Sequence, residues 1–274
     1  MKLHHDLVSA PDAKPTRAVL FLHGILGSGG NLRSHARRFV QQRPENLAVL
    51  VDLRAHGNSL EQDGNDTVAN CANDLVETAR TLTVPLSGVV GHSFGGKVAL
   101  AFAKVQQGLE HVMTLDSAPG PRGDARGSEA TLEVLTVLET LQQAWPSRDA
   151  FVAAIEAKGQ GKMLGQWLAM NLELRPEGWM FRLSLPRIHA LLDDYFNVDL
   201  WPVVEEAAHK GPLVHLVIGA RSQVYSHEDR IRAQQLEHDS NGRVTVDVLS
   251  AGHWVHVEDP QGVSEVLARR FTTS

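Results

Sequence analysis

The sequence predicts an α/β fold in which a mostly parallel central sheet is flanked by helices and a helical cap is inserted over one edge. Three observations support this prediction. Short apolar runs rich in β-branched residues alternate with segments of helical periodicity, as in parallel strands joined by right-handed crossovers. A glycine-rich turn separates one such run from a helix near residue 93. Between about residues 129 and 200, helical periodicity is almost continuous and no strong buried strand interrupts it.

Length and composition indicate an ordinary globular protein. The chain has 274 residues, of which 43% are hydrophobic and 21% are charged. Its net charge of −6 gives no support for binding to nucleic acid or to an anionic membrane. The N-terminus lacks the apolar segment of a signal peptide, and no run reaches the roughly 18 apolar residues of a membrane span. We therefore expect a cytoplasmic protein without a membrane span, as a monomer or a small homo-oligomer.

The core elements follow one another in the order strand, loop, helix. Their apolar runs are nearly continuous, which is typical of strands covered on both faces. Buried strands are expected at residues 18–22, 47–51, 89–91, 111–116, 212–219 and 243–249. Helices are expected at 32–42, before Pro44, and at 68–82, 98–103, 228–236 and 263–271. Residues 1–117 and 206–274 should together form this core.

Residues 118–205 should form the cap. The run Pro119-Gly120-Pro121-Arg122-Gly123 breaks the preceding pattern. Helices are then expected at 129–144, at 148–158 with Ser147 as its cap, at 162–174 and at 185–196. The large apolar side chains of this segment are assigned first to packing and second to lining a pocket; they are Trp145, Phe151, Trp167, Met170, Trp179 and Phe181.

The stretch Gly91-His92-Ser93-Phe94-Gly95 carries the strongest chemical signal. It matches G-x-S-x-G, a sharp strand-to-helix turn whose serine is exposed for nucleophilic attack and whose neighbours must be small. The apolar, β-branched run before it and the helical pattern after it supply the required context. We expect Ser93 to be a nucleophile and His92, beside it, to shape the turn.

A serine nucleophile requires a base and a carboxylate that orients the base. His253 follows the last predicted strand, so its loop can return it to the edge that carries Ser93. The loop after residue 219 contains no carboxylate, whereas Asp116 ends the strand that follows the serine helix and should emerge at the same edge. We therefore expect Asp116 to be the acid, with Glu228, at a helix start, as the reserve acid.

Two backbone N–H groups are candidates for binding the negative charge that develops on a substrate oxygen. They belong to Phe94, at the start of the serine helix, and to Ile25, in the glycine-rich loop after the first buried strand. The run Gly27-Ser28-Gly29-Gly30 matches neither a phosphate-binding nor a dinucleotide-binding motif. The histidines lack paired ligand spacing. We expect neither a cofactor nor a metal.

With these motifs in place, the chain resembles the α/β-hydrolase superfamily over its whole length, and more narrowly the YbfF-type acyl esterases and their mitochondrial abhydrolase-domain relatives. The resemblance implies a Ser-Asp-His triad with Asp116 as acid, and hydrolysis of carboxylic esters and acyl thioesters without a cofactor. The cap, residues 118–205, matches least well. The residues that carry the resemblance are His23-Gly24-Ile25-Leu26-Gly27-Ser28 with Asn31, Asp52-x-Arg54-x-His56-Gly57-x-Ser59, residues 91–97, Asp116, Ser222-Gln223 and Gly252-His253-Trp254-x-His256.

The sequence thus predicts a serine hydrolase acting on a small acyl ester or thioester of short to medium chain length. A lyase, C–C hydrolase or acyltransferase could use the same triad. Basic cap residues converging on the pocket, such as Arg148, Arg182 and Arg187, would favour a polyanionic substrate over a simple ester. A binding or receptor protein that keeps the triad without turnover is the alternative from another class.

Overall fold

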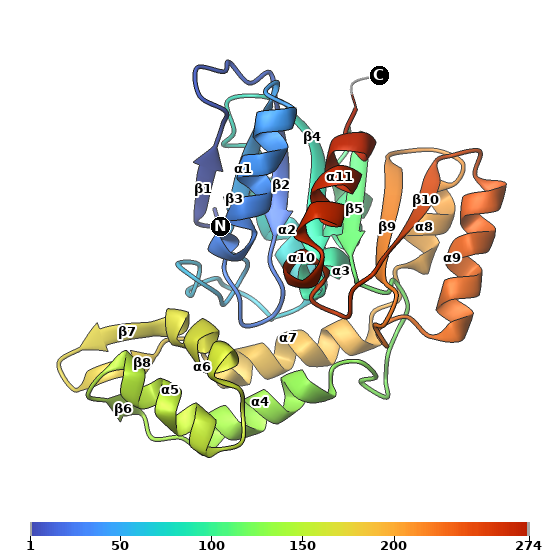
Figure 1. Cartoon of the computed structure of the whole chain (residues 1–274). Helices are drawn as coiled ribbons and strands as arrows, with labels where there is room; N and C mark the ends of the chain where they lie inside the picture. The colour runs from blue at the N-terminus through green and yellow to red at the C-terminus, as the bar shows by residue number, and fades with distance from the viewer. Residues whose placement is uncertain (1, 273–274) are drawn as a thin grey trace.

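A seven-stranded sheet forms the centre of the structure, a computed structural model that describes residues 2–272. The strand order is β1-β3-β2-β4-β5-β9-β10 (Figure 1). β1 is antiparallel to β3, and the other neighbouring pairs are parallel, which confirms the predicted sheet. The edge strand β1 was not predicted from the sequence. The strands are β1 His5–Val8, β2 Arg17–Leu22, β3 Asn46–Val51, β4 Leu86–His92, β5 His111–Leu115, β9 Leu213–Gly219 and β10 Val244–Leu249.

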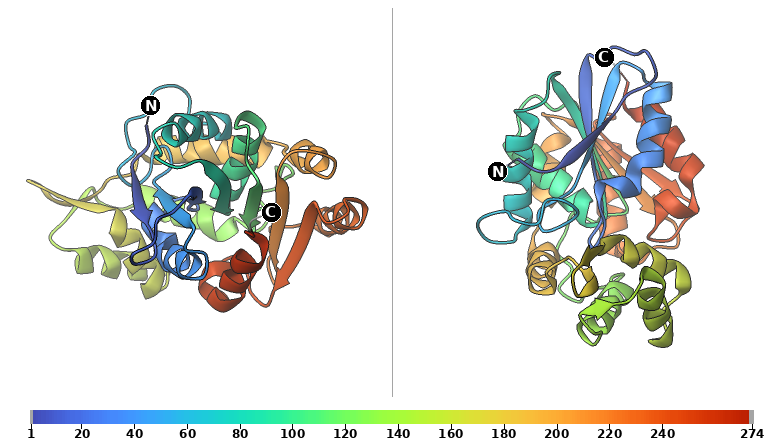
Figure 2. Two further views of the ribbon diagram at one scale, coloured as in Figure 1. Left: turned by 90° about the horizontal axis from the view of Figure 1, so that it is seen from above. Right: turned by 90° about the vertical axis from the view of Figure 1, so that its left-hand side faces the viewer.

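Helices cover both faces of this sheet (Figure 2, right). One face carries α1 and α11, and the other carries α2, α3 and α8, while α9 packs beside β10. The helices are α1 Arg33–Gln42, α2 Val68–Ala79, α3 Phe94–Val105, α8 Trp201–Ala207, α9 His227–Asp239, α10 Val255–Glu258 and α11 Pro260–Arg270, with a short 3-10 helix at Gly29–Leu32.

Side chains of one strand alternate between the two cores. In β2, Leu20 and Leu22 join the core under α2 and α3, whereas Val19 and Phe21 join the core under α1 and α11. All four side chains are fully buried. Because both faces are covered, the strand reads as a continuous apolar run and shows no polar alternation.

The chain after each parallel strand emerges at one common edge of the sheet, next to the cap (Figure 1). The loop that begins at His23 follows β2, Ser93 follows β4, Asp116 follows β5, and residue 220 follows β9. Parallel topology therefore gathers residues that lie far apart in the sequence. Open α/β sheets build their sites at this edge.

The segment predicted to be a helical cap contains four helices and also a small sheet. The helices are α4 Glu129–Glu139, α5 Arg148–Ala157, α6 Lys162–Leu168 and α7 Leu185–Asn197, and a 3-10 turn spans Ala169–Asn171. Three antiparallel strands in the order β6-β8-β7 were not expected: β6 Ala144–Trp145, β7 Leu172–Arg175 and β8 Gly178–Phe181.

Local sequence explains the difference. Leu172-Glu173-Leu174-Arg175 alternates apolar and polar residues, and Gly178 takes a φ of 125° directly after the turn that reverses the chain. The helix expected at 162–174 therefore ends at Leu168. The limit predicted between residues 205 and 206 lies inside α8, so a domain boundary placed there would divide a helix. Within residues 2–272, no helix is both long enough and apolar enough to cross a membrane.

Candidate active site

Ser93 occupies a strained turn between β4 and α3. Its φ is 51° and its ψ is −117°, a conformation that non-glycine residues rarely adopt. A Cβ atom on Gly91 would lie 2.0 Å from the carbonyl oxygen of Gly95, and one on Gly95 would lie 2.5 Å from that of His23. Only glycine fits at either position. The sequence motif is therefore a consequence of close backbone packing around the serine.

Asp116 also has a positive φ, 48°, and its side chain is fully buried at the end of β5. The Oδ1 atom accepts a hydrogen bond from the backbone N–H of Gly219 at 2.9 Å. The Oδ2 atom accepts one from the hydroxyl of Ser222 at 2.5 Å. These donors stabilise the ionised carboxylate and fix its orientation.

His253 lies beside Asp116 in the structure, 137 residues away in the sequence. Its Nδ1 is 2.8 Å from Asp116 Oδ2, so Nδ1 carries the proton and Nε2 is left free to accept one. The carbonyl of His253 accepts a hydrogen bond from Nε2 of His92 at 3.0 Å. Burial lowers the pKa of His92 well below its usual value, so this ring is a neutral support for the His253 loop.

The loop after β9, which the sequence showed to be empty of carboxylates, still takes part in this arrangement. Its Ser222 hydroxyl binds Asp116 beside the N–H of Gly219, the last residue of β9. This role of Ser222 is not predicted from the sequence. The available signal was the pair Ser222-Gln223, which carries part of the family resemblance and begins three residues after the end of β9.

The structure does not bring the reserve acid, Glu228, to His253. Glu228 is exposed in the first turn of α9, where its own backbone N–H and the Ser226 hydroxyl lower its pKa. Ser226 and Asp229 form a capping box there. Glu228 therefore acts as a residue of the helix start.

Of the two candidate oxyanion donors, Phe94 directly follows Ser93 and Ile25 directly follows Gly24, which lies near Ser93. Among residues 2–272, neither the N–H of Ile25 nor that of Phe94 donates to a protein acceptor. A Cβ on Gly24 would contact the Ser93 Cβ at 3.6 Å, which shows how near the two loops are. His23 supports this loop from below: its ring accepts a hydrogen bond from the Leu53 N–H and donates one to the Gly24 carbonyl.

A cavity of about 180 Å³ opens between this edge and the cap. Ser93 and His253 both line it, together with Ile25, on the core side. The cap contributes the apolar residues Ala130, Val134, Leu164 and Trp167 with Thr131, and the core loop contributes Trp254. No lysine, arginine, aspartate or glutamate lines this cavity among the described residues. The space beside the serine is therefore neutral and largely apolar.

The three cap arginines named above point elsewhere. Arg148 lies over the ring of Trp179, and Arg182 binds the carbonyl of Gly57. Arg187 makes two bonds to Asp66, at 2.6 and 2.7 Å. None of the three lines the cavity. The feature that would have favoured a polyanionic substrate is not present in the described residues.

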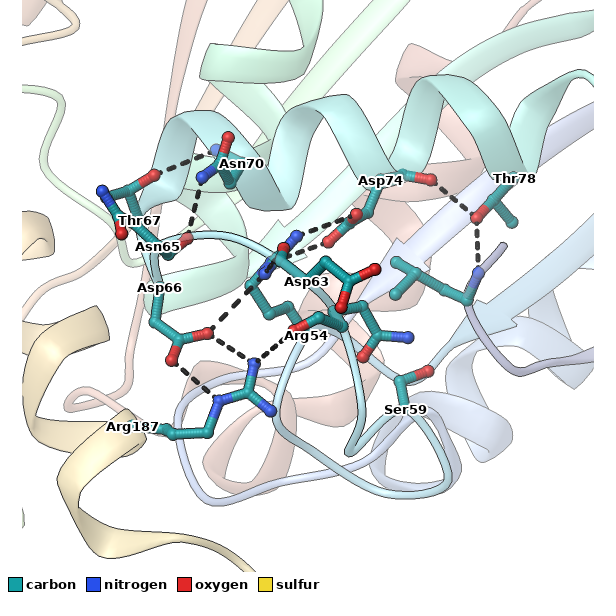
Figure 3. Close-up of polar contacts among 12 residues, drawn as sticks. Arg54, Ser59, Asp63, Asn65, Asp66, Thr67, Asn70, Asp74, Thr78 and Arg187 are labelled. Carbon is teal, nitrogen blue, oxygen red and sulfur yellow. Dashed lines mark hydrogen bonds and ion pairs between the residues drawn. The ribbon is translucent and has the colours of Figure 1, made fainter. Parts of the chain in front are cut away.

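Figure 3 shows how Arg187 belongs to a polar network between cap and core. Arg54 binds Asp74 of α2 through two bonds of 2.8 and 3.0 Å and lies 3.8 Å from Asp66. Asp66 therefore connects a core arginine to a cap arginine. Its hydrogen bonds raise the pKa of Arg187. The loop 54–67 is thereby attached to α7.

No group of three or more histidine, cysteine, aspartate or glutamate side chains within residues 2–272 has an arrangement that could hold a metal ion.

Known proteins resemble this chain over nearly its whole length. Esterase YbfF from Escherichia coli (strain K12) is 27% identical over 274 residues, covering 98% of each protein. The sn-1-specific diacylglycerol lipase ABHD11 from Mus musculus is 28% identical over 273 residues, covering 97% of this chain and 84% of the lipase. A solved marine microorganism esterase has the same fold, with a TM-score of 0.78, 18% identity, and coverage of 98% of this chain and 97% of that one.

The family model of the alpha/beta hydrolases matches residues 19–266, a range that includes the serine turn, Asp116, the cap and His253. The resemblance inferred from the motifs is confirmed, and the chain belongs to the alpha/beta hydrolase family.

Proposed function

We propose that the protein is a serine hydrolase that cleaves carboxylic esters or acyl thioesters of short to medium acyl length. The observation that carries this proposal is the hydrogen bond between His253 and Asp116 beside the strained Ser93, at the edge of a neutral cavity. The esterase and lipase relatives support the same reaction class.

In this proposal Ser93 attacks the acyl carbonyl while Nε2 of His253 accepts its proton. Asp116 holds the ring through Nδ1 and stabilises the imidazolium that forms. The N–H groups of Ile25 and Phe94 bind the oxyanion. His253 then protonates the leaving alcohol or thiol, and water hydrolyses the acyl-enzyme by the same steps in reverse order.

The cavity supports a neutral acyl group of modest length. Trp167 of the cap and Trp254 of the core pack edge to face, with ring centroids 5.5 Å apart, and form one wall. A cavity of about 180 Å³ has room for a short chain. Apolar walls favour burial of methylene groups over charged ones.

The test is hydrolysis of p-nitrophenyl esters from C2 to C16 and of short acyl thioesters. We expect an optimum among short to medium chains and a loss of about 10³-fold or more in kcat for Ser93→Ala. Ser34→Ala, at an exposed serine of α1, is the matched control and should keep full activity. Covalent labelling by a fluorophosphonate should occur in wild type and be absent from Ser93→Ala.

The alternatives give different results. Labelling at Ser93 without hydrolysis of any ester or thioester would contradict the esterase proposal and favour a lyase, C–C hydrolase or acyltransferase. The absence of both labelling and hydrolysis would contradict serine catalysis altogether and would favour a binding or receptor protein.

A further inference from the structure

The backbone of Leu26 is held from two sides. Leu26 follows Ile25 in the loop after β2, has a φ of 61° and is buried. Its N–H donates to Nε2 of His56 at 3.0 Å, and its carbonyl accepts a hydrogen bond from Nδ2 of Asn171 at 2.9 Å. His56 belongs to the core, whereas Asn171 belongs to the cap. A left-handed leucine is strained, so it persists only where its surroundings hold it in place.

The tautomer of His56, the partner of Leu26 in the core, is defined by its two hydrogen bonds. Nδ1 of His56 is 2.8 Å from the carbonyl of Arg54, which can only accept, so Nδ1 carries the proton and Nε2 is the acceptor for Leu26. Full burial lowers the pKa of His56 to about 3, so the ring stays neutral. His56 therefore presents a fixed acceptor to the loop.

The cap side is equally well fixed. Asn171 ends the 3-10 turn that follows α6, and its side chain is 5% exposed. Its own carbonyl accepts a hydrogen bond from the N–H of Arg182, which lies just after β8, at 3.0 Å. The side chain of Arg182 in turn binds the core residue Asn58 at 3.0 Å. The amide of Asn171 thus belongs to a part of the cap that contacts the core at two points.

The hydrogen bonds from Leu26 to His56 and from Asn171 to Leu26 hold the residue next to Ile25, a candidate oxyanion donor. The N–H of Gly27 closes the turn onto the carbonyl of Gly24 at 3.1 Å, so Ile25 and Leu26 are its two central residues. Rotation at Leu26 toward an ordinary φ would reorient the whole turn and move the Ile25 N–H away from Ser93. Oxyanion donors act only when they are held at hydrogen-bond distance from the position that the oxyanion will occupy.

We propose that Asn171 is a positioning residue for the oxyanion loop, so that the cap supports the chemical step as well as lining the cavity. This inference rests on the proposed function. A positioning role affects transition-state stabilisation, which appears in kcat, and leaves binding of the ground state unchanged.

Two variants separate the hydrogen bond from the fold. Asn171→Leu is close in size, carries no charge and has no hydrogen to donate, and Asn171→Ala removes the whole amide. Asn197→Ala is the matched control, because Asn197 is an exposed cap asparagine whose amide, among residues 2–272, binds only the Asp193 carbonyl. Titration of active sites with a fluorophosphonate gives kcat per folded site, and thermal unfolding measures any loss of stability.

We expect both Asn171 variants to lose about tenfold in kcat while KM stays within about twofold. A trifluoromethyl ketone, which forms an oxyanion adduct with a nucleophilic serine, should bind about tenfold more weakly to both. A non-reacting amide analogue of the substrate should bind as in wild type, and Asn197→Ala should behave as wild type in every measurement.

The outcomes are distinguishable. An active wild type with unchanged kcat and ketone affinity in both Asn171 variants would overturn this inference alone. A rise in KM with unchanged kcat would also overturn it, since it would assign Asn171 to substrate binding. A wild type that neither labels at Ser93 nor hydrolyses an ester overturns the proposed function and this inference with it.

Discussion

The sheet edge and the cap are built in different ways. At the edge, Ser93, Asp116 and His253 are brought together by parallel strands whose ends must meet, so strand order alone determines much of their placement. The cap packs its apolar side chains against the core on one face of the sheet, and a few polar contacts to residues far away in the sequence hold it there. Apolar faces can pack in several orientations, whereas hydrogen bonds require one. The placement of Ser93, Asp116 and His253 therefore depends on strand order, whereas the orientation of the cap depends on individual side chains.

Lys97 is the clearest of these individual side chains. It lies on α3, one turn after Ser93, and is fully buried. Its Nζ donates to the carbonyl of Gly120, where the chain enters the cap segment, at 2.8 Å. It also donates to the carbonyls of Tyr195 and Val198, where the chain leaves α7, at 2.7 and 3.0 Å. This one side chain thus joins both ends of the cap to the helix that follows Ser93, and burial lowers its pKa to about 7.

The largest effect should come from the sheet edge. Asp116→Asn removes the carboxylate that fixes the His253 tautomer, so we expect kcat for a short p-nitrophenyl ester to fall by about 10³- to 10⁴-fold with the fold intact. Glu228→Gln, which changes an exposed carboxylate, should leave kcat unchanged. A large loss in Glu228→Gln together with an active Asp116→Asn would refute the assignment of the acid.

The second largest effect should come from the attachment of the cap to the core. Lys97→Met leaves three carbonyls, two of them buried, without this donor, and we expect the free energy of unfolding to fall by about 3 kcal/mol. Amide hydrogen exchange should accelerate in residues 118–200 more than in the central strands. Lys104→Met, at an exposed lysine of the same helix, is the control and should change neither measurement. Uniform acceleration across sheet and cap would contradict the specific attachment of the cap by Lys97.

The sequence predicts residues whose placement depends on their immediate neighbours better than residues whose partners lie far away in the chain. The turn at Ser93 and the strand end at Asp116 leave local signatures, because their glycines and apolar runs lie within a few residues of the functional side chain. The structure pairs Asp116 with His253 as the sequence indicated. The roles of Ser222 and Asn171 have no such signature, since their partners lie 106 and 145 residues away. The strands of the cap were missed because a four-residue alternation is weak beside a longer helical periodicity.

The third effect is a loss of folding stability in acid, which we expect from buried histidines that lie outside the cap. Burial lowers the pKa of His23 to about 4, and lowers the pKa values of His56, His215 and His256 to about 3. All four residues lie outside the cap segment. Between these values and the ordinary histidine pKa of 6.5, the unfolded chain binds more protons than the folded one. Stability is therefore retained above about pH 6.5 and falls as the pH decreases below it.

Each such histidine should contribute up to about 1.4 kcal/mol per pH unit to this loss, measured by urea unfolding between pH 6.5 and 5. His215→Gln removes one of them, at a site where the ring contacts His111 and Thr245 away from the serine, and should make the slope shallower by about one proton. His209→Gln, at an exposed histidine, is the matched control and should keep the wild-type slope. An unchanged slope in His215→Gln would contradict a neutral buried ring at that position. Because the comparison uses the slope, a constant loss of stability caused by the substitution does not affect it. A shallower slope in His215→Gln therefore assigns about one proton of the acid sensitivity to this buried ring of the core.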